Sequence, residues 1–190
     1  SLGLVGSEMC IRDSENKELT QIMKIGRRFG PEGLNIVDQG NLEYEAGYDA
    51  YDAEGVKTQK TYLIKDGVLV GRLHTRETAA KMGERPTGNA RNISPFHTPI
   101  VRMTNTYMEP GEHSFEELLE MAGSGIFAVG ALGGQTNCEM FTFSAEEAFE
   151  IKNGKLGKRL RDVVLTGNVF TTLKNIKAIG KDFRLYGGLG

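Results

Sequence analysis

The glycines of this chain lie where tight turns between strands are needed. Asp66-Gly67 separates two short apolar runs, residues 61–64 and 68–73, and Asn153-Gly154 separates a second such pair. Asp-Gly and Asn-Gly between alternating apolar residues favour two-residue hairpins. Glycine accounts for 25 of 190 residues, about 13%, against a usual share near 7%. We therefore expect an α+β fold, mostly antiparallel β-sheet with hairpins and a few short helices.

Hydrophobic periodicity and capping residues predict the helices. Apolar residues recur at helical spacing over residues 16–29, and residues 75–82 fit two turns that end at Gly83. Ser114 and Glu117 form a capping box, which predicts a helix start. Asn168 is expected to cap a last helix that ends at Gly180. Further strands are expected over residues 34–37, 101–108, 123–134, 140–144 and 163–166.

Charge and cysteine content exclude several classes of protein. The net charge of −2 provides no basic field for nucleic acid or an anionic membrane. No apolar stretch approaches the roughly 20 residues of a membrane-spanning helix. Two cysteines, Cys10 and Cys138, cannot form a disulfide framework. We therefore expect a cytoplasmic protein that binds neither nucleic acid directly nor membranes.

The first fourteen residues do not fit the rest of the chain. The string SLGLVGSEMCIRDS has no helical or strand period and no signal-peptide pattern. It resembles a translated cloning or sequencing adaptor, although a natural N-terminal extension is the alternative. We expect residues 1–14 to be non-native and residues 15–190 to form one β-rich domain, truncated at both ends.

No nucleophile or metal motif is complete within the chain. His74, His97 and His113 lie too far apart in sequence for two imidazoles on one helix face, so each is expected to be an ordinary hydrogen-bonded residue. Cys138 has no second cysteine nearby and no basic neighbour that would lower its pKa, and we expect it to be structural. The sequence therefore predicts no catalytic residue and no metal ligand here.

Two segments combine glycine with hydrogen-bonding side chains. One is the run from Pro86 to Arg91 and the other is the predicted strand from Arg102 to Tyr107. Arginine and asparagine on a strand can bind a carboxylate or the amides of an extended peptide. The alternative is that these side chains join loops to the sheet. The candidate substrate-binding residues are Gly88, Asn89, Arg91, Arg102 and Asn105.

Eight short motifs in one order resemble the TldD/PmbA family of zinc metallopeptidases, most closely its TldD-like branch. The similarity covers essentially all of residues 15–190. The motifs begin at Asp52, Leu63, Pro86, Arg102, Pro110, Gly133, Phe141 and Thr166, and read DAEGV, LIKDGVL, PTGN, RMTNTY, PG, GGQ, FTFSA and TGN.

The resemblance implies a peptidase that hydrolyses small unfolded peptides. In this family, zinc is held by the two histidines of an HExxxH helix and by a later cysteine. Peptide is expected to bind as an extended strand within a homodimer or a heterodimer with a PmbA-like partner. These 190 residues contain no HExxxH, and Cys138 falls in a different part of the pattern. We expect the ligands to lie outside this chain, which alone would bind no zinc and be inactive. The alternative is a non-catalytic peptide-binding or assembly subunit.

Overall fold

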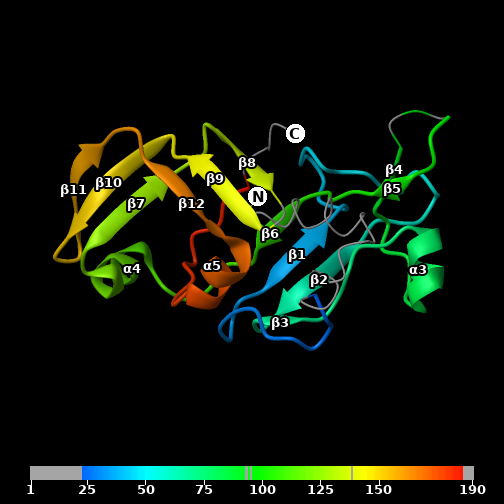
Figure 1. The fold of residues 1–190 in the computed structure, drawn as a ribbon, viewed down its shortest axis with the longest axis horizontal. Helices are drawn as coiled ribbons and strands as arrows, with labels where there is room; N and C mark the ends of the chain where they lie inside the picture. Colours follow the sequence, from blue (N-terminus) through cyan, green and yellow to red (C-terminus); the bar gives the residue numbers. More distant parts are fainter. Residues whose placement is uncertain (1–22, 93, 95, 138, 186–190) are drawn as a thin grey trace. The chain divides into compact units, whose positions relative to one another are not determined.

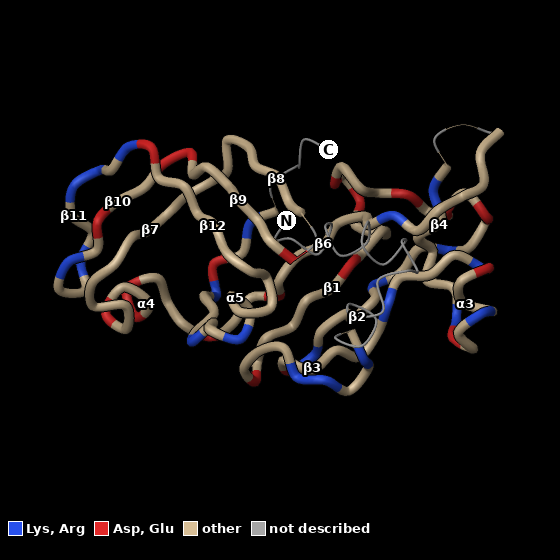
Figure 2. The backbone as a smooth tube through the Cα atoms, viewed as in Figure 1, with Lys and Arg blue, Asp and Glu red and all other residues tan. Residues whose placement is uncertain are grey.

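A computed structural model describes residues 23–92, 94, 96–137 and 139–185 (Figure 1). The chain folds as two compact units, one that runs to Glu109 and also takes in Arg184 and Leu185, and one from Pro110 to Phe183. Both are built from short antiparallel strands and a few short helices, which confirms the α+β prediction. Basic and acidic residues are interspersed along the backbone of each unit (Figure 2). No helix in the described part of the chain is long and apolar enough to span a membrane.

The first unit is organised around a four-stranded sheet of order β3-β2-β1-β6. The strands are β1 (Ile36–Gln39), β2 (Lys60–Lys65), β3 (Val68–Leu69) and β6 (Thr106–Met108). Asp66 and Gly67 both adopt positive φ, 48° and 75°, so the predicted Asp-Gly hairpin joins β2 to β3. The core beneath the sheet is formed by buried aliphatic side chains, among them Leu34, Ile36, Val37, Ile64 and Leu69.

A short ribbon and one helix complete this unit. The ribbon pairs β4 (Ala90–Arg91) with β5 (Ile100–Val101). Helix α3 (Arg76–Met82) has Thr75 as its N-cap. Gly83 lies in the left-handed conformation at its C-terminus, where the sequence predicts the helix to end. The segment between β1 and β2 is an ordered loop that forms one isolated bridge, between Tyr51 and Lys57.

The helix predicted over residues 16–29 is wrong for the residues that are described. Residues 16–22 lie outside the described residues, and residues 23–29 form turns and a bridge. The amide of Gly26 donates to the carbonyl of Leu69, and the amide of Leu69 donates to the carbonyl of Arg27. Gly26 has a φ of 87°, so the backbone leaves the helical region and pairs beside β3 instead.

The second unit contains two three-stranded antiparallel sheets, β11-β10-β7 and β12-β9-β8. The strands are β7 (Gly125–Val129), β8 (Gly133–Asn137), β9 (Met140–Ser144), β10 (Glu147–Lys152), β11 (Lys155–Leu160) and β12 (Val164–Asn168). The predicted Asn153-Gly154 turn joins β10 to β11. The apolar interior of the unit includes Phe141, Ile151 and Leu173.

Both helices of the second unit start where capping residues predict. Helix α4 (Phe115–Ala122) begins after Ser114, whose hydroxyl accepts the amide of Glu117 while the Glu117 carboxylate accepts the amide of Ser114. Helix α5 (Val169–Asn175) is capped by Asn168. It ends before the predicted Gly180, because Gly180 pairs with His113 and its carbonyl accepts the amide of Gly111.

Candidate functional site

The strand predicted over residues 101–108 is interrupted between Val101 and Thr106. It forms β5 and β6, which pair with different partners, β4 and β1. Thr104, between these strands, and Thr106, the first residue of β6, both bond to Asp38 of β1. Thr104 donates to the Asp38 carboxylate through its backbone amide, at 2.9 Å, and through its hydroxyl, at 2.7 Å. Thr106 donates its hydroxyl to Asp38 at 2.7 Å.

Asn89 reaches the same carboxylate from the other polar segment. Its Nδ2 atom lies 2.7 Å from Oδ2 of Asp38 and 3.1 Å from the carbonyl of Arg102. The backbone carbonyl of Asn89 also accepts the amide of Arg102 at 2.8 Å. The structure thus brings the two polar segments together around one buried carboxylate.

Asp38 is the residue that the sequence reasoning missed. Its side chain is only 1% exposed, and a buried charge must be satisfied by hydrogen bonds. The strand expected over residues 34–37 stops short of Asp38, although the position of Asp38 two residues after buried Ile36 places both on one face of β1. That signal, an ionisable residue on the buried face of a strand, would have identified it.

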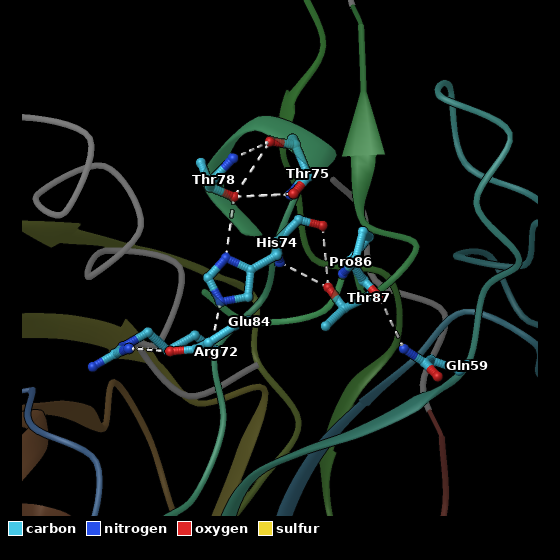
Figure 3. A network of polar contacts seen from close by, with 8 residues as sticks. All are labelled: Gln59, Arg72, His74, Thr75, Thr78, Glu84, Pro86 and Thr87. Atoms are coloured by element: carbon cyan, nitrogen blue, oxygen red, sulfur yellow. Dashed lines mark hydrogen bonds and ion pairs between the residues drawn. The ribbon is translucent and has the colours of Figure 1, made fainter. Parts of the chain in front are cut away.

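A second network holds the segment that leads to Gly88 and Asn89 (Figure 3). His74 is buried, with Nε2 at 2.8 Å from the Glu84 carboxylate and Nδ1 at 3.1 Å from the Thr78 hydroxyl. The amide of His74 donates to the hydroxyl of Thr87 at 2.7 Å, and Arg72 forms an ion pair with Glu84. His74 is therefore a hydrogen-bonded core residue that links helix α3 to this segment.

Gly88 allows two backbone segments to approach closely. Its φ is 79°, and a Cβ atom at this position would lie 2.7 Å from both the carbonyl oxygen of Lys57 and the Cα atom of Thr58. The absence of a side chain lets segment 86–89 pack against residues 57 and 58, just before β2. Glycine is required here both for its conformation and for the absence of a side chain.

The side chains of Arg91 and Asn105 hold the loop that follows β1. Arg91 donates to the Asp49 carboxylate at 3.0 Å and to the carbonyl of Gly47 at 3.4 Å. Asn105 donates to the carbonyl of Gln39 at 3.0 Å and accepts the amide of Gly47 at 2.9 Å. These contacts are of the kind expected if the two side chains join loops to the sheet.

Arg102 differs from the other four candidates. Its side chain is exposed, and its guanidinium forms no ion pair or hydrogen bond with any residue that the structure describes. Its backbone, in contrast, is held on both sides by Asn89. Of the five predicted residues, Arg102 alone combines a fixed backbone with a charged group available to a ligand.

The described residues do not fit a zinc site. They bring no three His, Cys, Asp or Glu side chains into a group that could hold a metal ion. Cys138 and Cys10 lie outside the described residues, as do residues 1–14.

Comparison with known proteins identifies the family. Residues 11–190 match the PmbA/TldA metallopeptidase C-terminal domain, and the chain belongs to this family. A metalloprotease of Synechocystis is 53% identical over 169 residues, 89% of this chain and 36% of the relative. A zinc metalloprotease TldD homolog of Saccharolobus solfataricus is 35% identical over 164 residues, 85% of this chain and 37% of the relative. The chain thus spans little more than a third of the length of these relatives.

A solved structure shows the same fold. TldE from Thermococcus kodakarensis superposes with a TM-score of 0.75 and 21% sequence identity, over 96% of this chain and 41% of that one. At this identity the likeness establishes the fold alone. The family resemblance noted from the eight motifs is confirmed.

Proposed function

We propose that this chain is the C-terminal domain of a TldD-like zinc metallopeptidase that hydrolyses small unfolded peptides in the cytoplasm. The observation that carries the proposal is the family match over residues 11–190, together with 53% identity to a relative named a metalloprotease. A relative of 35% identity is named a zinc metalloprotease, which supports zinc as the metal of the complete protein.

Within that protein we assign this chain a role in binding peptide. Arg102 supplies an exposed guanidinium that can pair with a carboxylate or donate to peptide carbonyls. Asn89 and Asp38 fix the backbone on which Arg102 is carried. Gly88, Asn89, Arg91 and Asn105 contribute to the site by holding its loops, and the reaction at the metal is proposed to use residues outside this chain.

The experiment that tests the peptidase proposal uses a protein extended at both ends to the length of its relatives. We expect it to contain about one zinc per chain and to cleave an unstructured peptide, with a chelator abolishing cleavage. The 190-residue chain alone is expected to contain no stoichiometric zinc and to leave the peptide intact. An extended protein that takes up no zinc would contradict the enzyme proposal.

The second candidate is a peptide-binding or assembly subunit that pairs with a catalytic partner. It is favoured by the exposed guanidinium of Arg102, which forms no ion pair or hydrogen bond with any described residue and is free to bind a ligand. The same experiment separates the two candidates. If the extended protein binds the peptide but contains no zinc and does not cleave it, the second function is supported. The oligomeric state of the extended protein would then be measured with and without a PmbA-like protein.

A further inference from the structure

The loop between β1 and β2 presents an aromatic side chain entirely to solvent. Tyr44 is 99% exposed, and two further tyrosines of this loop, Tyr48 and Tyr51, are 42% and 61% exposed. We call residues 40–56 the tyrosine loop. Aromatic side chains normally bury most of their surface, so a fully exposed ring on an ordered loop indicates a contact surface.

The tyrosine loop is held in place at its base. The amide of Asp49 donates to the carbonyl of Gly40 at 3.0 Å, and the amide of Thr58 donates to the carbonyl of Ala50 at 3.2 Å. Asn105 and Arg91 hold its middle through Gly47 and Asp49. Exposure of Tyr44 is therefore a property of a fixed loop, and binding would require little further ordering of it.

The backbone at Tyr44 is also unfavourable for such a residue. Its φ is 71°, in the left-handed region that bulky side chains rarely adopt. Glycine or asparagine would occupy this position without cost. A bulky aromatic residue kept in this conformation, with its ring in water, is not explained by the stability of the loop.

The charges of the loop indicate what kind of ligand it accepts. Residues 40–56 contain five acidic residues and no lysine or arginine. Three of the carboxylates are already engaged: Asp49 pairs with Arg91, Asp52 accepts three backbone amides, and Glu54 accepts the amide of Arg76. The remaining two, Glu43 and Glu45, flank Tyr44 and pair with no residue in the described part of the chain.

We propose that the tyrosine loop is a docking site for a peptide segment that carries arginine or lysine, with its cationic group placed over the Tyr44 ring between Glu43 and Glu45. An aromatic face attracts a guanidinium or ammonium group, and adjacent carboxylates add charge-assisted hydrogen bonds. The inference rests on the proposed peptide-binding function, because Arg91 and Asn105 hold this loop beside the candidate site. It adds a preference for cationic peptides.

The test compares three labelled octapeptides, in which alanine alternates with arginine, glutamate or glutamine, on the complete protein with chelator present to prevent cleavage. The arginine peptide is expected to bind most tightly, with an affinity that falls as salt is raised. Tyr44→Ala should weaken its binding by about two- to fivefold, the contribution of an exposed cation–π contact. Phe96→Ala is the matched control and should leave binding unchanged, since Phe96 is similarly exposed, at 96%, but lies outside the tyrosine loop.

A glycine variant separates binding from folding. Tyr44→Gly should lose the same affinity while the melting temperature stays equal or rises, because glycine adopts the observed φ freely. Unchanged binding of the arginine peptide by Tyr44→Ala, or a lower melting temperature for Tyr44→Gly, would overturn this inference alone. Failure of the wild-type protein to bind any of the three peptides would overturn the proposed function itself.

Discussion

The Nδ2 atom of Asn89 lies 2.7 Å from Oδ2 of Asp38, and both side chains are buried. This hydrogen bond joins two residues that lie 51 positions apart in sequence. The same Nδ2 atom of Asn89 also donates to the carbonyl of Arg102. The position of the exposed Arg102 thus depends on a carboxylate that no ligand is expected to touch.

Loss of the Asp38 carboxylate should destabilise the first unit. In Asp38→Ala, Asn89 Nδ2 and the amide of Thr104 each lose a partner, and each unsatisfied buried donor costs about 1–3 kcal/mol. We expect the free energy of unfolding in urea to fall by at least about 2 kcal/mol. Asp49→Asn removes only the partly exposed pair with Arg91 and should cost less than about 1 kcal/mol. An equal loss of unfolding free energy in the two variants would show that the hydrogen bonds of Asp38 stabilise the unit no more than an exposed ion pair does.

Two glycines test the close approach at the site. Gly88 and Gly55 have nearly the same φ, 79° and 72°, but a Cβ atom would meet backbone only at Gly88. Gly55→Ala should cost about 1–2 kcal/mol, the penalty of the left-handed conformation. Gly88→Ala should cost about 1–3 kcal/mol more, because it also overpacks the contact with Lys57 and Thr58. Thermal unfolding of the pair measures the difference, and identical melting temperatures would contradict the contact.

The capping box of α4 gives a pH dependence. The hydrogen bond from the Ser114 amide lowers the pKa of Glu117 from its ordinary value. A lowered pKa means that the stability provided by this carboxylate is present above the unfolded-state pKa and is lost as pH falls through the folded-state pKa. Wild type should therefore exceed Glu117→Gln in urea midpoint at pH 7, with the difference disappearing toward pH 3.

Glu116→Gln is the control for this titration. Glu116 lies in the same first turn and accepts no backbone amide among the residues that the structure describes. Its substitution should lower the urea midpoint at pH 7 by less than Glu117→Gln does, because no capping hydrogen bond is lost. If the urea midpoint of Glu117→Gln stays parallel to that of wild type from pH 7 to pH 3, the hydrogen bond from the Ser114 amide is not the cause of the pH dependence.

Local signals in the sequence predict much of the fold. These signals act over a few residues and lie where they are expected: the turn at Asp66-Gly67, the helix end at Gly83, and the caps Ser114 and Asn168. Failures occurred where a distant strand competed with local preference. Residues 23–29 pair beside β3 instead of forming a helix. The hydrophobic periodicity of one segment does not reveal its pairing with a distant strand.

The candidate site was only partly predictable for the same reason. The polar segments around Asn89 and Arg102 were recognisable from their composition, but their meeting point at Asp38 depends on sheet register between distant strands. The sequence could not distinguish a ligand-binding asparagine from one that holds a loop. In the structure, Asn105 forms hydrogen bonds with Gln39 and with Gly47 of the loop that follows β1.

The central claim, that Arg102 binds peptide while Asn89 and Asp38 only position it, is tested most directly by the KM of the complete peptidase for an unstructured peptide. Arg102→Ala should raise KM by roughly tenfold, which corresponds to the loss of one charge-assisted hydrogen bond of about 1.5 kcal/mol, with kcat and melting temperature nearly unchanged. Arg102→Lys should restore part of the loss. An unchanged KM, or a large fall in melting temperature, would contradict the account.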